Sequence, residues 1–380
     1  MMVVQDTTDK IRIEVPDVSG GMGDTITMVE GAIVVPPPKD NVNRSVQRSG
    51  VLTPDGRFVT DSITWRGTNQ VTTAPPMPAA DEIAALPGTW MFLGPLFGHF
   101  GHFLVESISR IWAFEQLRDR IDGVLYVPKF QNRPAQVASS YRPFLEALGV
   151  TAPVRNLEDA TRVERLYVPR QGFGMFQMIE GAPEFRAFTR AHAGKSIPPR
   201  GAEKIYISRS ALPAQRGSIL GETILEELLR DEGYEPFHPQ QHTHEEQIAA
   251  YRAARQVVAV DCSPLHLLAL VGDEEQNVGI IARRAGDLDE IFARQIRAFT
   301  GARAHAINHL RRNWIEGHAN RPSRTSWGEV DFPALGRSLR EAGLIAGGNW
   351  PALDEAAIRT QMARVGETLG IGFRPWGEGG

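Results

Sequence analysis

From residue 90 onward, short apolar runs alternate with stretches whose apolar residues recur at helical spacing. The apolar runs at 90–93, 124–127 and 166–168 predict strands, and the stretches at 98–117 and 135–148 predict amphipathic helices. A strand, a helix and another strand in succession form the βαβ pattern, which brings parallel strands into one sheet beneath helices. The pattern therefore predicts a Rossmann-like domain over residues 90–195.

A second alternating series follows residues 194–201, which contain Pro198 and Pro199 and are typical of a linker. In this series we expect strands at 204–208, 256–260 and 277–281, and helices at 223–230 and 245–255. The strands are mostly apolar along their length, which favours a parallel sheet covered by helices. The expected fold class is α/β, with two Rossmann-like domains facing a cleft and the second domain over residues 202–330.

The two ends of the chain have a different character. Residues 1–89 contain breakers such as Pro36-Pro37-Pro38 between short β-like runs, so we expect an irregular β-rich segment. Residues 331–380 are punctuated by Gly and Pro and contain one amphipathic helix, predicted at 353–369. We expect this helical extension either to brace the first domain or to meet a partner.

Composition narrows the classes of function. The chain has 380 residues, and 41 Lys and Arg against 45 Asp and Glu give a formal net charge of −4, so it lacks the basic field that binding to nucleic acid requires. A single cysteine excludes an intramolecular disulfide and fits a reducing compartment. Residues 1–15 have no uninterrupted apolar core for a signal peptide, and no apolar run approaches 18 residues. We expect a soluble cytoplasmic protein whose association with a membrane, if any, is peripheral.

A first candidate site lies at the start of the helix expected at 98–117. At helical spacing His99, His102, Glu106 and Arg110 share one face, and a polar stripe on an otherwise apolar helix needs partners. Glu106 is the favoured general base, with His102 as the alternative base or orienting partner. His99 and Arg110 are expected on the acceptor side. In the structural alternative, the histidines cap or pack the helix start and Glu106 simply pairs with Arg110.

A second candidate site follows the strand expected at 204–208. Ser208 and Arg209 stand at the carboxyl end of this strand, where open α/β sheets bind ligands, and Arg216 lies in the next loop. Two arginines there can bind a diphosphate through charge-assisted hydrogen bonds. The alternative is a solvated pair of arginines in a surface loop.

A third candidate site joins the helix expected at 245–255 to the strand that follows it. Ser263 and Pro264 suit the N-cap and the first position of a new helix, whose free N–H groups would face an anion. Glu245 or Glu246 could receive ribose hydroxyls, although an acidic residue in the first turn of a helix also stabilises it.

The residues of these sites also allow two other kinds of enzyme, a cysteine hydrolase and a metalloenzyme. A cysteine hydrolase would use Cys262 with His266, but four residues along a helix is not a usual route to a nucleophile and its base. A metalloenzyme would use His99, His102 and Glu106, which match no recognised signature, or three histidines of a polar loop, His238, His242 and His244.

Taken in order, three blocks of sequence resemble glycosyltransferase family 61, which includes capsular-polysaccharide transferases and xylosyl- and N-acetylglucosaminyltransferases. They are GHFLVESISRIW at 101–112, KIYISRSALPAQR at 204–216 and HEEQIAAYRAARQVVAVDCSPLH at 244–266. The resemblance implies a GT-B fold and an inverting transfer of a hexosyl or pentosyl group from a nucleotide sugar to a glycan or polysaccharide acceptor. It implies no cofactor and no obligatory metal, since positive side chains would take the metal's place.

The matching residues are Glu106 and Arg110 in the first block, Ser208, Arg209 and Arg216 in the second, and Gln247, Ser263 and His266 in the third. One departure stands out. The family often has a His-Gly-Ser/Ala-like segment after the buried strand, where this chain has Asp261-Cys262-Ser263-Pro264. Without that glycine, close approach of the backbone to a phosphate is harder. A catalytically inactive relative that binds nucleotide sugar or glycan is therefore the alternative function.

Overall fold

The computed structural model of the chain describes residues 13–23, 26–39, 45–130 and 132–377. Most of the N-terminal segment considered above for a signal peptide, residues 1–12, lies outside them. The chain divides into two compact units, Met1–Ser196 and Ile197–Gly380, and each has its own sheet and core. We refer to them as unit 1 and unit 2.

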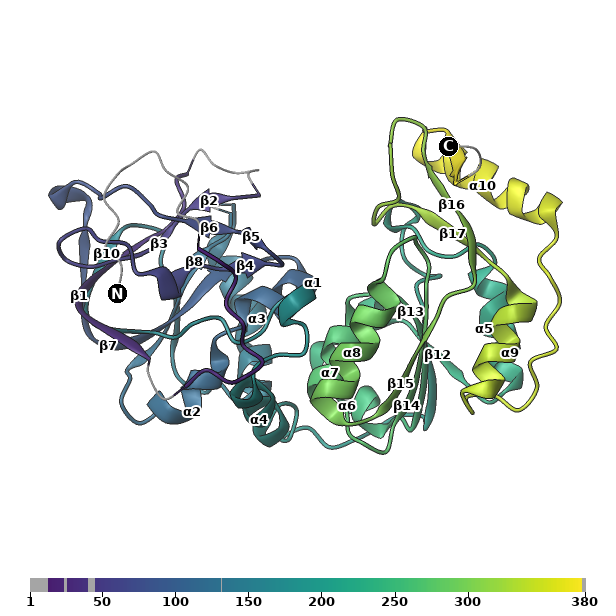
Figure 1. The fold of residues 1–380 in the computed structure, drawn as a ribbon, viewed down its shortest axis with the longest axis horizontal. Coiled ribbons are helices and arrows are strands. Elements are labelled where there is room, and N and C mark those ends of the chain that lie inside the picture. The colour runs from purple at the N-terminus through teal and green to yellow at the C-terminus, as the bar shows by residue number, and fades with distance from the viewer. Residues whose placement is uncertain (1–12, 24–25, 40–44, 131, 378–380) are drawn as a thin grey trace. The chain divides into compact units, whose positions relative to one another are not determined.

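Unit 1 is built on a mixed sheet with the strand order β3-β1-β10-β7-β8-β9 (Figure 1). The strands are β1 Thr27–Val35, β3 Gly50–Leu52, β7 Ala84–Leu96, β8 Gly123–Pro128, β9 Val154–Asn156 and β10 Thr161–Val168. β10, β7, β8 and β9 pair in parallel, whereas β1 runs antiparallel to both β10 and β3. The sheet thus combines the expected parallel strands with strands from the first 89 residues, and the α/β class is confirmed.

Short elements surround this sheet. Two small β pairs come from the N-terminal part of the chain: β2 Gln47–Arg48 with β6 Thr72–Thr73, and β4 Trp65–Arg66 with β5 Asn69–Gln70. The longer helices of unit 1 are α3 Pro134–Ala147 and α4 Pro183–His192, and each has Pro near its first turn, where the missing N–H costs nothing.

The single helix predicted at 98–117 is wrong. The segment forms α1 Phe100–His102, a π-helical turn Phe103–Ser107, a 3-10 turn Ile111–Ala113 and α2 Phe114–Leu117. The Ser109 hydroxyl donates to the carbonyl of Glu106 at 2.7 Å, and this bond competes with the helical ladder. Residues 103–114 are buried on every side, so tertiary packing rather than helical periodicity sets their path.

Unit 2 contains a parallel sheet with the strand order β12-β11-β13-β14-β15. Its strands are β11 Lys204–Ile207, β12 Glu235–Phe237, β13 Gln256–Val260, β14 Asn277–Ile281 and β15 Arg303–Ile307. Figure 1 shows helices on both faces, with α6, α7 and α8 on one and α5 and α9 on the other. The bounds are α5 Glu222–Asp231, α6 His244–Ala253, α7 Pro264–Val271, α8 Leu288–Thr300 and α9 Phe332–Glu341. The parallel sheet predicted for this part of the chain is confirmed.

The C-terminal extension packs within unit 2. β16 Leu310–Glu316 pairs antiparallel with β17 Trp327–Val330 and with β18 Phe373–Trp376. The predicted tail helix is α10 Glu355–Leu369, capped by the Asp354 side chain, and it buries Ile358, Met362 and Val365 against Leu220. Of the two roles left open for this helix, the structure therefore shows bracing, but of the second unit rather than the first. No helix in the described part of the chain is both long and apolar enough to span a membrane.

Candidate active site

The strand order of unit 2 reverses direction between β11 and β13, and this reversal fixes where a ligand can bind. The chain starts at β11, moves outward to β12, and returns to β13 on the other side of β11. In an open parallel sheet, the crevice outside the carboxyl ends of the strands at such a switch point is the usual ligand site. Arg209 follows β11 there, Asp261 follows β13, and Arg283 follows β14.

The turn after β11 is held by a buried carboxylate, Glu222, at the start of α5. Its Oε1 accepts hydrogen bonds from the Tyr206 hydroxyl at 2.9 Å and the Arg209 N–H at 2.7 Å, and lies 3.3 Å from the Ser208 hydroxyl oxygen. Burial raises the pKa of Glu222, although the hydrogen bonds oppose the rise. Ser208, a predicted donor ligand, is buried, and its hydroxyl donates to Glu226 at 2.6 Å.

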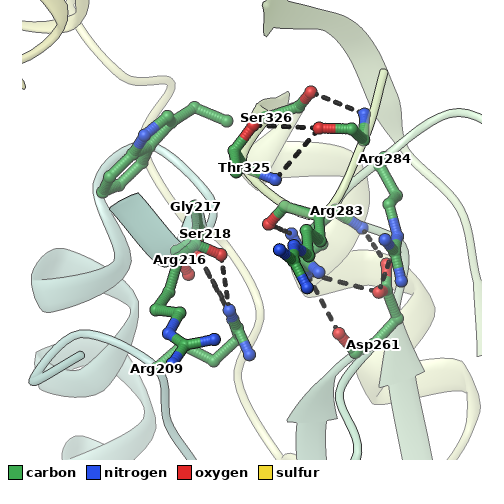
Figure 2. A network of polar contacts seen from close by, with 12 residues as sticks. Arg209, Arg216, Gly217, Ser218, Asp261, Arg283, Arg284, Thr325 and Ser326 are labelled. Carbon is green, nitrogen blue, oxygen red and sulfur yellow. Dashed lines mark hydrogen bonds and ion pairs between the residues drawn. The ribbon is translucent and has the colours of Figure 1, made fainter. Parts of the chain in front are cut away.

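Arg209 is half-buried at the end of β11, and its hydrogen-bond partners are carbonyl groups. The guanidinium donates to the Arg216 carbonyl at 2.7 Å and to the Gly217 carbonyl at 3.0 and 3.2 Å (Figure 2). Burial lowers the pKa of Arg209, and the neighbouring charge of Arg283 lowers it further. No described carboxylate forms an ion pair with the Arg209 guanidinium, although the charges of Glu222 and Asp261 lie near enough to act on it.

Arg216 contributes to this arrangement mainly through its backbone. Its carbonyl accepts a hydrogen bond from the Arg209 guanidinium, while its side chain is exposed and forms no ion pair with a described residue. The next residue, Gly217, has φ +60°, and a Cβ there would lie 2.3 Å from the Ser326 carbonyl oxygen. The loop that holds Arg209 therefore depends on glycine at position 217.

A second pair of arginines faces the same end of the sheet and was missed by the sequence reasoning. Asp261 is fully buried, and its Oδ1 lies 3.2 Å from Arg283 Nε and 3.3 Å from Arg284 Nε (Figure 2). Both arginines stand just beyond the carboxyl end of β14. The same strand-end rule that singled out Arg209 was a signal for them, because the strand at 277–281 had been predicted.

The third block supplies several buried, internally bonded side chains. The Gln247 amide donates to the Pro239 and His242 carbonyls at 2.9 and 3.1 Å, and His266 Nδ1 lies 2.6 Å from Gln295 Oε1. Glu245 is exposed in the first turn of α6. Its neighbour Glu246 forms a capping box with Thr243.

The turn into α7 follows the sequence prediction in position but not in bonding. Ser263 occupies the N-cap of α7 and Pro264 its first turn, as expected, but the Ser263 side chain makes no capping bond. Burial raises the pKa of the Cys262 thiol to about 12, so this side chain is neutral near pH 7 and is not a nucleophile.

A separate constellation in unit 1 centres on Glu106, which is fully buried in the π-helical turn. Arg66, from the small β4–β5 pair, donates to both carboxylate oxygens, Nε to Oε1 at 2.5 Å and Nη2 to Oε2 at 2.8 Å. His102 Nδ1 lies 3.0 Å from Oε2. Burial alone would raise the pKa of Glu106, but the hydrogen bonds and charges of His102 and Arg66 outweigh it and lower the pKa.

The two ends of the predicted polar stripe have different environments. His99 is exposed at the N-cap of α1, with its ring centroid 5.2 Å from that of His102. Arg110 is fully buried and donates to the carbonyls of Pro169 at 2.9 Å and Ile63 at 2.6 Å. Gly94 makes room for it, since a Cβ there would lie 2.7 Å from Arg110 Nη1.

Arg110 therefore does not pair with Glu106, and its guanidinium is bonded within the core of unit 1. The predicted face holds for His102 and Glu106 but does not extend to Arg110, because the chain leaves the α-helical path after His102.

Lys129 joins Arg66 and His102 around the Phe97 ring. Its centroid lies 5.7 Å from Arg66 Cζ, 5.7 Å from Lys129 Nζ and 5.4 Å from the His102 ring. Burial lowers the pKa of Lys129 to about 8, and the charge of Arg66 adds to this effect. Among the described residues no group of three or more His, Cys, Asp or Glu side chains is arranged to hold a metal ion.

Comparison with known proteins bears on the resemblance that the three sequence blocks indicate. A search of curated proteins gave no match. Residues 100–275 match the family model described as Glycosyltransferase 61, an interval that contains His102, Glu106, Arg209 and Asp261 but not Arg66, Arg283 or Arg284. The resemblance to glycosyltransferase family 61 drawn from the three sequence blocks is thus confirmed over this interval.

Proposed function

We propose that this family 61 glycosyltransferase takes its sugar from a nucleotide-sugar donor bound at the switch point of unit 2. The observation that carries the proposal is Arg209, a half-buried residue at the carboxyl end of β11 whose guanidinium is bonded to carbonyls and to no described carboxylate. A guanidinium in that setting favours an anionic ligand. The diphosphate of a nucleotide sugar supplies the anion, and Arg216 offers a second cation from the same loop.

Some of the other predicted donor-binding residues are exposed and others are buried, and we propose different roles for the two groups. Glu245 is exposed in the first turn of α6 and is the proposed ribose ligand, and Ser263 contributes through the backbone at the start of α7. Ser208, Gln247 and His266 are buried and bonded internally, so we assign them to shaping the site rather than to contacting the donor.

The proposed reaction inverts the configuration of the transferred hexosyl or pentosyl group. An acceptor hydroxyl oxygen forms a bond to the anomeric carbon on the face opposite the diphosphate. The bond from that carbon to the diphosphate oxygen breaks, its electron pair leaves with the nucleoside diphosphate, and the acceptor proton passes to a base. Arg209 and Arg216 neutralise the charge that develops on the leaving group, and for this reason we propose that no metal ion is needed.

For the base, the contacts within unit 1 favour His102 over Glu106. Glu106 is fully buried, its carboxylate is bonded to Arg66, and its pKa is lowered, so it binds a proton poorly. The His102 side chain is 39% exposed. When its Nδ1–H donates to Glu106, Nε2 keeps the lone pair that accepts the acceptor's proton. We propose that His102 is the base and that Glu106 positions it.

The proposed donor and acceptor groups come from different units. Since the family resemblance implies a GT-B fold, we propose that arrangement for this chain. The acceptor is proposed to be a glycan or polysaccharide in the cytoplasm, with the protein at the inner face of the membrane when the acceptor is attached to lipid. A role in building capsule-type polysaccharide is part of the same proposal.

Donor binding tests this function most simply. Isothermal titration of the full chain against UDP-, GDP-, ADP- and CDP-sugars is expected to identify one nucleotide class that binds. Arg209→Ala should weaken that binding by at least about 1.5 kcal/mol, since it removes charge-assisted hydrogen bonds. Arg297→Ala is the matched control, because Arg297 is an exposed arginine of the same unit that pairs with Glu290. Equal donor affinity of Arg209→Ala and wild type would contradict the proposed site.

A further inference from the structure

The charges around Asp261 do not balance. A single buried carboxylate faces two guanidinium groups, since Oδ1 contacts Arg283 Nε at 3.2 Å and Arg284 Nε at 3.3 Å. Arg209 is close enough that the charge of Arg283 lowers its pKa. The neighbouring Cys262 is neutral near pH 7 and does not reduce the excess. The ends of β11 and β14 therefore present more positive charge than the carboxylate between them neutralises.

The geometry also leaves donors to spare. Arg283 Nε donates a hydrogen bond to the Asp261 carbonyl at 3.0 Å, and Arg283 Nη1 donates a longer one to the Arg324 carbonyl at 3.4 Å. The two terminal nitrogens of Arg284 make no hydrogen bond to a described residue. Arg283 is hydrogen-bonded at Nε and Arg284 Nε makes an ion-pair contact with Asp261 without a hydrogen bond, so both arginines keep terminal N–H groups for an anionic ligand.

Asp261 orients the first arginine from several directions. Its Oδ2 accepts the main-chain N–H of Arg283 at 3.0 Å, while its main-chain carbonyl accepts the Arg283 side chain. This double contact fixes both the backbone and the guanidinium of the residue beyond β14 (Figure 2). Where the family often has a glycine-containing segment, this chain thus has Asp261, which orients the Arg283 guanidinium.

The far side of this arrangement comes from residues outside the interval matched by the family model. Asn313 accepts the Ala285 N–H at 2.7 Å and donates to the Arg283 carbonyl at 3.0 Å, which fixes the segment after β14. The 323–326 turn packs on Gly217, and the Gly217 carbonyl accepts a hydrogen bond from the Arg209 guanidinium. Elements beyond residue 275 therefore join the two arginine positions into one framework.

We infer that Arg283 and Arg284, positioned by Asp261, bind the same donor diphosphate as Arg209 and replace the close backbone contact that a glycine would otherwise allow. The inference rests on the proposed function. Arg209 reaches the site from the end of β11 and the Asp261-held pair from the end of β14. Two linked phosphates satisfy both sets of donors, whereas a single phosphate satisfies one set. The site therefore selects diphosphates over monophosphates, and Arg283 and Arg284 neutralise the leaving group during transfer.

Calorimetric titration of the full chain tests this inference. ADP, CDP, GDP and UDP identify the preferred base, and the nucleoside diphosphate and monophosphate of that base are then compared. Two changes are informative: Arg284→Gln, and the double change Asp261→Asn with Arg283→Gln, which removes the fully buried pair together and leaves Arg284, whose side chain is 22% exposed, in reach of water. Each should weaken diphosphate binding at least about tenfold and monophosphate binding much less. Arg297→Gln should leave both affinities unchanged.

The positioning role of Asp261 has its own readout. Asp261→Asn releases the orientation of both arginines but also removes a negative charge, so diphosphate affinity should fall at high ionic strength, where the added positive charge is screened. Arg284→Gln removes one positive charge and should lower both the affinity and its dependence on ionic strength. If Arg209→Ala loses diphosphate binding while Arg284→Gln and the double variant keep wild-type affinity and selectivity, the inference fails and the proposed function stands. If wild type binds none of the four diphosphates, the proposed function fails, and this inference with it.

Discussion

Replacing Glu106 by Gln tests how the acceptor side works, because it changes charge and proton placement with little change in shape. Glu106 Oε2 accepts a hydrogen bond from Arg66 Nη2 at 2.8 Å and lies 3.0 Å from His102 Nδ1. A glutamine can turn its amide N–H toward Nδ1, which moves the imidazole proton to Nε2 and removes the lone pair needed for base catalysis. We expect turnover to fall by roughly 10²- to 10⁴-fold, the range for loss of a general base and its tautomer control.

The effect on stability should be smaller than the effect on turnover. Removing one partner of a fully buried ion pair costs about 3–5 kcal/mol. Here the Arg66 side chain is 31% exposed and can regain water, and glutamine still accepts one of its hydrogen bonds. A loss of about 1–2 kcal/mol of unfolding free energy is therefore expected.

The pH dependence of stability gives a second readout. Because the pKa of Glu106 is lowered, its ionisation stabilises the fold above pH about 4.5, and that stability is lost as the pH falls through the lowered value. The Gln variant should lack this acid-dependent loss.

The assay compares donor affinity, turnover and denaturant unfolding for wild type, Glu106→Gln and His102→Gln. Both variants should bind donor normally and lose turnover to a similar extent, because they disable one unit of two residues. Near-normal turnover in His102→Gln, with a large loss in Glu106→Gln, would return the role of base to Glu106. Near-normal turnover in both would refute the assignment of this constellation to catalysis.

Three further predictions follow from the same contacts. Arg110→Met should cost about 3–5 kcal/mol of unfolding free energy in unit 1, because buried carbonyls lose a charged donor, and should leave donor affinity intact; a stable variant with a raised acceptor KM would restore its acceptor role. Wild-type unfolding free energy should rise by up to about 3 kcal/mol between pH 8 and pH 10.5 because the folded state binds Lys129's proton less tightly, and Lys129→Met should flatten this slope in denaturant titrations. EDTA should leave transfer intact, and activity that returns only with added Mn²⁺ or Mg²⁺ would contradict the metal-free reaction.

Local pattern was sufficient wherever burial and periodicity coincide. The strands at 256–260 and 277–281 were predicted to the residue, because each is an apolar run that is rich in β-branched residues and starts at a polar residue. The position of Ser263 at an N-cap was predictable for a similar reason, since Pro follows it. In these places the sequence neighbours alone decide the conformation.

The acceptor-side constellation could not be predicted in the same way. Arg66 reaches Glu106 from a two-residue strand forty positions earlier, and no local pattern reports such a contact. His102 and Glu106 still meet at i,i+4 spacing, but the π-helical and 3-10 turns carry Arg110 off that face, so spacing arguments placed Arg110 beside Glu106 wrongly. Arg283 and Arg284 are different, because their position after a correctly predicted strand was visible in the sequence.

Release of nucleoside diphosphate tests the central claim most directly. Wild-type protein is incubated with the nucleotide sugar that binds best, with and without a panel of glycan acceptors, and the nucleoside diphosphate and the glycosylated product are measured together. The account predicts that release depends on an acceptor, matches product formation, and is lost in Arg209→Ala and Arg284→Gln but retained in Arg297→Ala. A donor that binds tightly while no acceptor promotes release or product would contradict it and would leave a nucleotide-sugar-binding protein without transferase activity.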